Sequence, residues 1–330
     1  MSGVSLLGLL EAEAGRYVSG EEISRKLNVS RTAIWKQVRK LEADGYEIEA
    51  VPRLGYRLLG KPSRLTVQDL LPKLHTKRFG KQLRLLDVVP STQDELRKLA
   101  ENGAEEGTLV IAEQQTKGRG RMGRYWVSPS GKGVWMSLLL RPPVPLPHTP
   151  QLTLLAAVAL SRAISRLVKI EIGIKWPNDL LVGGKKISGI LLESAAEDER
   201  LRYIVVGLGI SANLDPEDYP EELLAKAISL KMASGSAVDR GELIASILSE
   251  FENLYDLYLE QGFEPIRSLW EAHAVTLGRM TSLYTPQGVI EGIPRELDAM
   301  GGLKVELADG TYRTVYSAEI GNSNSEGVGS

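Results

Sequence analysis

The chain has 330 residues, and its 40 Lys and Arg against 42 Asp and Glu give a formal net charge of -2, so any nucleic-acid contact must come from a local basic patch. It contains no cysteine, which excludes disulfides, thiolate metal sites and cysteine nucleophiles, and its three histidines are too scattered to predict a His-ligated metal. The length predicts two or three domains. No apolar run approaches the roughly 20 residues that span a membrane and no signal peptide begins the chain, so we expect a cytoplasmic protein without membrane contact.

Residues 1–60 predict a winged helix-turn-helix domain. Ser19 precedes a helical segment with Glu22 three residues on, which is the pattern of a capping box. A short turn follows, and Ser30 caps a second helix over 31–44 that ends at Gly45. Two short helices joined by a three- to four-residue turn are the helix-turn-helix arrangement. Two alternating runs within 46–59 then predict a β-wing.

The second helix of this pair predicts contact with DNA. Ile34, Val38 and Leu41 fall on one face and should pack inward, which leaves a face between 31 and 40 with four cations and no acid. A winged helix would place this face in the major groove. The alternative is a helical interaction or cap domain whose cations are merely solvated. The predicted DNA-binding residues are Arg31, Thr32, Trp35, Lys36, Arg39 and Lys40.

After a linker at 61–66, residues 67–274 predict a catalytic domain with a mixed sheet. The apolar runs 83–89 and 134–140 are typical of buried strands, and the long apolar segment 150–168 predicts a core helix. The strands are joined by hairpins as often as by helices, which favours an α+β arrangement over a doubly wound one.

The last part of the chain has a different pattern. Four or five short strand-like runs separated by glycine turns lie within 275–321, and this spacing predicts a small β-barrel. Residues 322–330, NSNSEGVGS, are expected to form a disordered tail.

The segment KGRGRMGRYW, at 117–126, predicts an anion-binding loop. It places four cations among three glycines, and glycine lets backbone N–H groups approach an anion closely. Arginine supplies planar, permanently charged forks that match phosphate or carboxylate. A disordered Gly/Arg-rich nucleic-acid tail is usually repetitive and terminal, whereas this loop lies between two apolar runs. A solvated loop without function is the remaining alternative.

Four other segments carry polar groups, at 90–95, 175–179, 183–189 and 207–213. Each has a plain structural explanation as a helix cap, a turn, a solvated lysine or a glycine-containing strand. Together with the Gly/Arg loop they suit an ATP-derived intermediate, with lysines and arginines stabilising charge as a carboxylate attacks the α-phosphate. The chain lacks the P-loop motif, and it lacks the arrangements of covalent catalysis.

The segments GRGRMGRYW, KWPNDLLV, KKISGILLES and GLGISAN resemble the signature segments of biotin protein ligases. The N-terminal helix-turn-helix resembles that of the bifunctional members, which also repress the biotin operon. The resemblance covers the chain except its tail. It implies an α+β multidomain fold: a winged helix-turn-helix, a central mixed-sheet α/β ligase domain similar to class II synthetases, and a small SH3-like β-barrel.

The resemblance also implies roles for individual residues. Lys186, Arg121 and Arg119 would be catalytic. Family members usually carry asparagine where this chain has Ser211, and Asn213, on the same strand face, is a candidate replacement. Biotin would be bound by Ser91, Thr92, Gln93, Gln115, Arg119, Gly120, Arg121 and Lys186. The nucleotide would be bound by Gly118, Trp126, Lys175, Asn178, Asp179, Gly209, Ser211 and Asn213, with no metal held by protein side chains.

The implied reaction has two steps. Biotin and ATP, with Mg²⁺, give biotinyl-5′-AMP and pyrophosphate, and the biotinyl group then passes to a lysine of biotin carboxyl carrier protein or another biotin-accepting domain. Biotinyl-5′-AMP would also be the corepressor that promotes a homodimer on operator DNA. The alternatives are a ligase whose N-terminal domain does not bind DNA, a non-catalytic biotin-sensing repressor, and a lipoate ligase. The intact Lys186 and arginine loop disfavour the last two.

Overall fold

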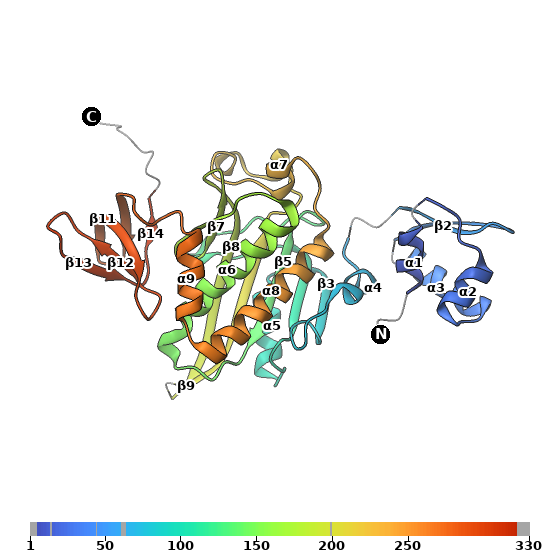
Figure 1. Cartoon of the computed structure of the whole chain (residues 1–330), viewed down its shortest axis with the longest axis horizontal. Coiled ribbons are helices and arrows are strands. Elements are labelled where there is room, and N and C mark those ends of the chain that lie inside the picture. Colours follow the sequence, from blue (N-terminus) through green and yellow to red (C-terminus); the bar gives the residue numbers. More distant parts are fainter. Residues whose placement is uncertain (1–4, 14, 44, 61–63, 199, 322–330) are drawn as a thin grey trace. The chain divides into compact units, whose positions relative to one another are not determined.

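The computed structural model describes residues 5–13, 15–43, 45–60, 64–198 and 200–321 (Figure 1). The chain divides into two compact units, Met1–Lys73 and Leu74–Ser330. Half of the predicted linker and all of the predicted tail, 61–63 and 322–330, lie outside the described residues.

The first unit contains α1 (Leu6–Ala12), α2 (Gly20–Leu27), α3 (Arg31–Ala43) and the strands β1 (Glu47–Val51) and β2 (Gly55–Gly60). Helix α2 begins as predicted, because the Ser19 side chain accepts a hydrogen bond from the backbone N–H of Glu22 at 3.1 Å. Ile34, Val38 and Leu41 are buried in one cluster with the leucines of α1. The predicted helix pair and its inward face are therefore confirmed.

Backbone hydrogen bonds hold the β1–β2 hairpin against the segment between α1 and α2, and Gly55 allows the two segments to approach closely. Tyr56 on β2 exchanges two backbone hydrogen bonds with Val18, at 2.8 and 2.9 Å. Gly55 has φ +109°, and a Cβ placed on it would lie 2.0 Å from the Val18 carbonyl oxygen. No residue with a side chain fits there. The antiparallel hairpin is present where a wing was predicted, and its action as a wing on DNA stays a prediction.

A mixed sheet of seven strands forms the centre of the second unit within the described residues, in the order β3-β4-β5-β9-β8-β7-β6. Strand β3 runs parallel to β4 through the crossover helix α5 (Thr92–Glu101), and the remaining neighbours are antiparallel. The predicted mixed sheet is confirmed. The strands are β3 (Leu83–Val89), β4 (Leu109–Gln115), β5 (Val134–Leu140), β6 (Gly173–Lys175), β7 (Asp179–Val182), β8 (Lys185–Glu197) and β9 (Arg200–Ile210).

Helices α6 (Thr149–Val168) and α8 (Arg240–Gln261) lie over one face of this sheet, with α9 (Glu264–His273) beside them (Figure 1). Contrary to the sequence expectation, the segment Leu146–Val168 is long and apolar enough to cross a membrane by length and composition, but 67% of its most apolar window is buried inside the fold. The predicted core helix is therefore confirmed. The short helix α7 (Leu230–Ser234) precedes α8.

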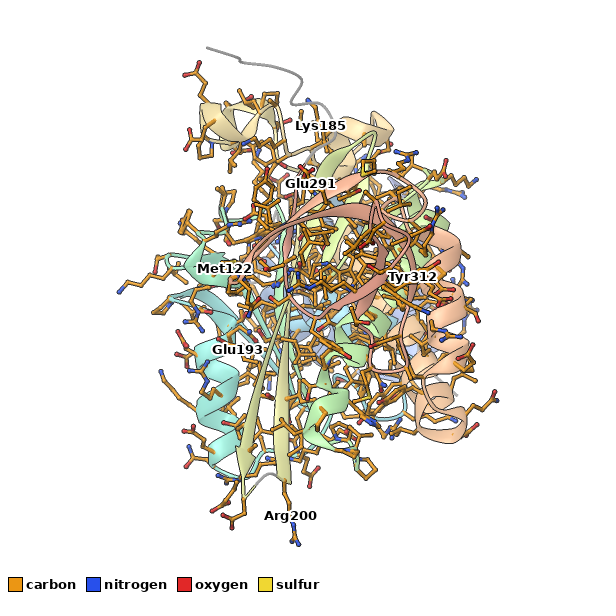
Figure 2. The ribbon with its side chains drawn as sticks, turned by 90° about the vertical axis from the view of Figure 1, so that its left-hand side faces the viewer. Met122, Lys185, Glu193, Arg200, Glu291 and Tyr312 are labelled. Carbon is orange, nitrogen blue, oxygen red and sulfur yellow. The ribbon has the colours of Figure 1, made fainter. Side chains whose placement is uncertain are left out.

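The opposite face of the sheet leads into the pocket described below. Tyr203 and Val205 of β9 pack against Leu96 of α5 on this face. Alternate residues of a strand share a face, so Gly207 and Gly209 continue the same row. Figure 2 shows Glu193 partway along β8 and Arg200 at the end of the long β8–β9 hairpin.

The C-terminal part folds as an antiparallel sheet of five strands within the described residues, in the order β13-β12-β11-β10-β14. Its glycine-bounded short strands agree with the prediction, whereas closure into an SH3-like barrel stays a prediction. Gln151 Nε2 of α6 donates to the Ala299 carbonyl at 2.8 Å, and Trp176 Nε1 donates to that of Gly301 at 3.3 Å. The strands are β10 (Thr281–Thr285), β11 (Gly288–Leu297), β12 (Leu303–Glu306), β13 (Tyr312–Val315) and β14 (Glu319–Ile320).

Glu252 of α8 fixes the chain just before β3. Its carboxylate accepts backbone hydrogen bonds from Lys77, Arg78 and Phe79 at 2.6, 2.7 and 3.0 Å. Burial by itself would raise the pKa of Glu252, but these three N–H groups outweigh it and hold the pKa below its usual value of 4.5. The carboxylate form is thus favoured in the folded protein.

Glu252→Gln is expected to lower the free energy of unfolding by about 1–3 kcal/mol at neutral pH, because one N–H would face an amide nitrogen. A carboxyl with a lowered folded-state pKa stabilises the fold above its unfolded pKa, and this contribution is lost as the pH falls through the folded-state pKa. Denaturant unfolding at about pH 7 and about pH 4 measures both effects. Glu260→Gln, an exposed change on the same helix, is the control. Equal destabilisation at both pH values would contradict the carboxylate's role.

Candidate functional site

A pocket of about 730 Å³ opens in the second unit between the ends of the central strands, the 117–126 loop and β14. Most of the predicted site residues line it, although they come from six separate parts of the sequence. Gly118 and Asn213 are not among the lining residues. Those that line it are Ser91, Thr92, Gln93, Gln115, Arg119, Gly120, Arg121, Trp126, Lys175, Asn178, Asp179, Lys186, Gly209 and Ser211.

One end of the pocket is a buried network of hydroxyl and amide groups. The Thr92 backbone N–H donates to Gln115 Oε1 at 2.9 Å, and Gln115 Nε2 donates to Ser128 Oγ at 3.1 Å. The Thr92 hydroxyl also lies 2.8 Å from Ser137 Oγ. Ser128 and Ser137 were not among the residues predicted from the sequence. Ser137 could have been recognised from the sequence, because it is the one residue with a hydroxyl group within the apolar run of β5.

Gln93 presents an unsatisfied acceptor at the same end. Its Nε2 donates to the Leu191 carbonyl and to Glu193 Oε2, both at 3.1 Å. Its Oε1 is buried and has no hydrogen-bond partner among the described residues. A buried acceptor without a donor is costly, so a ligand N–H is the group that this oxygen lacks.

The two glycines of β9 make room for protein side chains. A Cβ on Gly207 would lie 2.9 Å from Gln93 Cδ, and a Cβ on Gly209 would lie 2.6 Å from Trp126 Nε1. Gly189, the cross-strand partner of Gly209, is similarly close to the Trp126 ring at 3.2 Å. Two glycines in a buried strand allow a planar group to approach it closely, and here an amide and an indole occupy that space.

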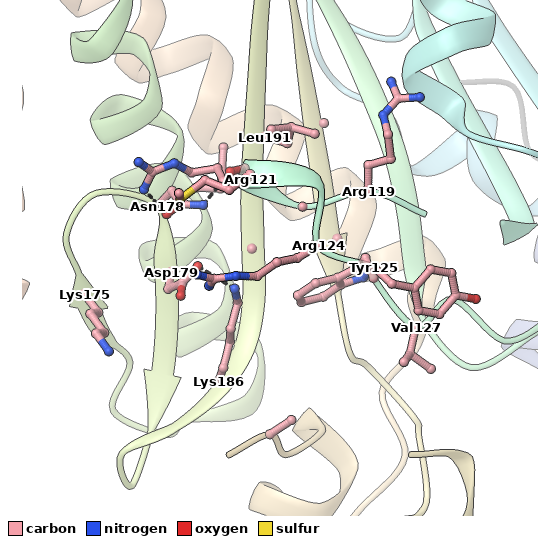
Figure 3. Close-up of a pocket in the computed structure, with 18 of the residues that line it drawn as sticks. Arg119, Arg121, Arg124, Tyr125, Val127, Lys175, Asn178, Asp179, Lys186 and Leu191 are labelled. Carbon is pink, nitrogen blue, oxygen red and sulfur yellow. Dashed lines mark hydrogen bonds and ion pairs between the residues drawn. The ribbon is translucent and has the colours of Figure 1, made fainter. Parts of the chain in front are cut away.

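The other end of the pocket gathers cations around one carboxylate. Lys186 Nζ lies 2.6 Å from Asp179 Oδ1 and 5.2 Å from the centroid of the Trp126 ring. Arg121 Nη1 donates to Asn178 Oδ1 at 3.2 Å. Figure 3 shows Lys186 beside Asp179, and Arg121 beside Asn178. Two predicted residues from neighbouring strands, one from the β6–β7 turn and one from the loop are therefore brought together.

Burial changes the acid–base properties of two of these cations. Burial lowers the pKa of the Lys175 amine below its usual range, and the nearby Asp179 carboxylate opposes part of this change. Burial likewise lowers the pKa of the Arg121 guanidinium, again against the attraction of Asp179. A partly desolvated cation interacts strongly with an incoming anion, because little water screens it.

Arg119 behaves differently from Arg121. Its Nη1 makes a forked contact with Asp94 of α5, at 2.9 and 2.8 Å, and its Nη2 lies 3.4 Å from Glu193. Hydrogen bonding to Arg119 holds the pKa of Asp94 below its usual value. Figure 3 shows the Arg119 guanidinium turned away from Lys186 and Asp179. In this structure Arg119 anchors the loop to α5, and its contact with biotin stays a prediction.

The far side of the loop is held by the C-terminal sheet. Arg121 Nη2 donates to Ser317 Oγ at 2.9 Å, and Arg124 forms an ion pair with Glu319. Met122, at the tip, has φ +56° and is 77% exposed (Figure 2). Ser317 and Glu319 are more than 190 residues from the arginines that they bind, so no local sequence pattern predicts these contacts.

Gly118 and Asn213 have structural partners instead of places in the pocket lining. The backbone N–H of Trp126 donates to the Gly118 carbonyl at 2.9 Å. A Cβ on Gly118 would lie 2.4 Å from the backbone oxygen of Trp126, so glycine allows the two ends of the loop to approach this closely. The Asn213 amide donates to the Val238 carbonyl and accepts from its N–H, at 2.9 and 2.8 Å. Both ends of the amide are therefore engaged, and the structure does not bring Asn213 to the nucleotide end as a replacement for an asparagine at 211.

The first unit presents the predicted DNA-binding face. All six predicted residues of α3 are exposed, opposite the buried Ile34 and Val38. Trp35 is 53% exposed, and the Arg39 guanidinium lies 5.4 Å from its ring centroid and 3.2 Å from Glu42.

Comparison with known proteins finds a matching family model in each of the two units. The model of the "Biotin/lipoate A/B protein ligase family" matches residues 85–211, and that of the "HTH domain" matches residues 5–57. The biotin protein ligase of Aquifex aeolicus, solved in complex with biotin and ATP, superposes with a TM-score of 0.63 at 31% identity, covering 73% of this chain and 98% of that one.

Two relatives that match over nearly their whole length identify the family more specifically. The "Bifunctional ligase/repressor BirA" of Bacillus subtilis (strain 168) is 46% identical over 96% of this chain and 97% of its own length. That of Escherichia coli (strain K12) is 30% identical over 94% and 95%. The fold and the pocket thus define a biotin/lipoate-type protein ligase domain joined to a helix-turn-helix domain. The chain belongs to the family of bifunctional ligase/repressor proteins.

Proposed function

We propose that this protein is an ATP-dependent biotin protein ligase that also represses biotin-synthesis genes in response to biotin. The observation that carries the enzymatic part is the pocket, in which a buried amide and hydroxyl network faces a cluster of partly desolvated cations. A small neutral ring with N–H and carbonyl groups suits the first end, and a carboxylate joined to a phosphate suits the second.

Biotin would place its ureido ring at the end formed by Ser91, Thr92, Gln93 and Gln115. The unpaired Gln93 Oε1 would accept a ureido N–H. Thr92 and Gln115 hold each other rigidly, so little ordering would be needed on binding. Arg119 and Gly120 would cover the valeryl chain from the loop, and the biotin carboxylate would reach Lys186 and Arg121.

In the first step the biotin carboxylate oxygen forms a bond to the α-phosphorus of ATP, and the bond to the leaving pyrophosphate breaks. Lys186 and Arg121 would stabilise the negative charge that builds on the α-phosphate. The ion pair with Asp179 orients Lys186 toward this point. Mg²⁺ would enter with the phosphates as part of the MgATP substrate. Trp126, Gly209 and Ser211 would lie along the nucleotide.

In the second step the amine of an acceptor lysine attacks the acyl carbon, and AMP leaves. Lys175, Asn178 and Asp179 flank the pocket where this amine would enter. The acceptor would be biotin carboxyl carrier protein or another biotin-accepting domain. Arg121 would exchange its bonds to Asn178 and Ser317 for the adenylate phosphate, while Arg124 and Glu319 hold the loop across the pocket.

The first unit would act as a winged helix-turn-helix on operator DNA. Helix α3 would enter the major groove and the β1–β2 hairpin would touch the backbone. Biotinyl-5′-AMP would serve as the corepressor by promoting a homodimer, since two copies can read a palindrome. The C-terminal sheet would close as an SH3-like barrel beside a class II synthetase-like domain. Both activities place the protein in the cytoplasm.

Biotin-dependent ATP–pyrophosphate exchange by the purified protein tests the enzymatic part. We expect labelled pyrophosphate to enter ATP only when biotin is present, and the product to biotinylate a carrier domain. Exchange with lipoate but not biotin would indicate a lipoate ligase. Biotin binding without exchange would indicate a non-catalytic sensor. Exchange without any ligand-enhanced binding to DNA upstream of biotin-synthesis genes would indicate a ligase alone.

A further inference from the structure

Tyr219 is a buried tyrosine of the pocket that the sequence analysis did not single out. It follows the short helical turn Pro216–Asp218, and only 8% of its surface is exposed. Its ring belongs to an apolar cluster with Trp135 and Leu214, against which Trp126 packs. Tyr219 nevertheless lines the pocket. The residue is therefore held firmly by packing while part of it faces the ligand space.

The Tyr219 hydroxyl is buried beside Ser211. Its oxygen has no well-formed hydrogen bond within the described part of the chain. Burial raises the pKa of this hydroxyl, and a side-chain interaction with Ser211 opposes part of the rise, so the two side chains face each other. Ser211 is itself buried and lines the pocket. A buried oxygen that the fold leaves unpaired is a costly feature, which a bound ligand can offset.

The surroundings of this oxygen suit a flat, largely apolar ring with a polar edge. Leu223 and Ala227 pack on the same cluster and line the pocket beside Trp126. The Lys186 N–H donates to the backbone carbonyl of Lys226, so this wall adjoins the cationic end without being part of it. Aromatic and aliphatic walls with a few buried polar groups are what a nucleobase requires, whereas phosphates require the cations.

We propose that the Tyr219 hydroxyl, together with Ser211, hydrogen-bonds the polar edge of the purine base of ATP and of biotinyl-5′-AMP. This inference rests on the proposed ligase function and adds a nucleotide-binding residue to it. A hydroxyl can both donate and accept, so it can pair with a ring nitrogen or with the exocyclic amino group. The packed ring fixes where the oxygen lies, and the base then completes its hydrogen bonding.

Tyr219→Phe removes this oxygen and keeps the packed ring. We expect the Kd of α,β-methylene-ATP, which cannot be cleaved at the reacting bond, to rise about two- to tenfold, as for the loss of one hydrogen bond. The KM for ATP in pyrophosphate exchange should rise by a similar factor. The KM values for biotin and pyrophosphate should not change, because neither contains the base. The melting temperature of the free protein should fall little, since the hydroxyl's interaction with Ser211 is not a well-formed hydrogen bond.

Tyr203→Phe is the matched control. Tyr203 is also buried, but its hydroxyl bonds to Glu101 at 3.4 Å, outside the pocket. It should leave the nucleotide constants unchanged. An unchanged Kd for α,β-methylene-ATP in Tyr219→Phe would overturn the proposal. Equal rises in the constants for biotin, pyrophosphate and ATP would also overturn it, because they indicate a general distortion. A wild-type protein without biotin-dependent exchange would instead overturn the proposed function.

Discussion

Lys186→Ala is expected to lower the rate of biotin-dependent ATP–pyrophosphate exchange by a factor of about 10²–10³, which is typical for one lost donor to a developing negative charge. The Lys186 ammonium lies between the Asp179 carboxylate and the face of Trp126, at the pocket's cationic end. Alanine would remove the charge and leave Asp179 facing the incoming anions unpaired. Repulsion by this carboxylate should add to the loss.

Lys185→Ala is the neighbouring control. The Lys185 Nζ donates to the Leu224 carbonyl at 3.1 Å on the exposed side of β8, so its loss should leave the exchange rate within about twofold. Melting curves of both variants check the fold. Lys186→Arg keeps the charge but changes its geometry, and it should recover part of the rate. Near wild-type exchange by a folded Lys186→Ala protein would remove Lys186 from the catalytic site.

The double change Lys36→Ala and Arg39→Ala is expected to weaken binding to operator DNA by about 10- to 100-fold at moderate salt while leaving the ligase reaction unchanged. Both side chains are on the exposed face of α3. The logarithm of the DNA-binding constant falls linearly with the logarithm of the salt concentration, and each phosphate contact makes this slope steeper by about 0.9. A dimer would lose four such contacts, so the slope should fall by about three to four. Removal of Arg39 also takes away the cation stacked on Trp35.

Gel shifts over a series of salt concentrations, with biotin and ATP present, measure both quantities. The control is Lys81→Ala with Lys98→Ala, which removes two exposed cations from the second unit and changes the net charge equally. It should leave the salt slope unchanged. If the two double variants weaken DNA binding equally, α3 is not the DNA-binding element.

Much of the local structure could be predicted because its causes are local. The apolar spacing of Ile34, Val38 and Leu41 required a helix with one buried face, and Ser19 marked a helix start by its ability to accept the Glu22 N–H. The apolar runs at 83–89 and 134–140 predicted buried strands of the mixed sheet. The motif residues come together because several of them follow strand ends that meet at one side of that sheet.

Partners across the fold were decided only by the tertiary structure. Arg119 and Arg121 have the same charge and lie two residues apart, yet one pairs with Asp94 and the other bonds to Asn178 and Ser317. No periodicity specifies this choice, because a guanidinium binds whichever oxygens the packing brings within reach, and in the loop those come from α5, the β6–β7 turn and the C-terminal sheet.

Contacts between distant segments also decide that Tyr219 lines the pocket and Asn213 does not. Asn213 was expected to share a strand face with Ser211, but β9 ends at Ile210 and the Asn213 amide is held by the backbone of Val238. Tyr219 lies in a segment without periodicity and is brought to the pocket by packing on Trp135. The sequence by itself determined the elements, the buried faces and the residue types of the site, since these follow from short-range spacing. The fold alone decided which polar groups are already paired and which still face the ligand, since that depends on contacts between distant segments.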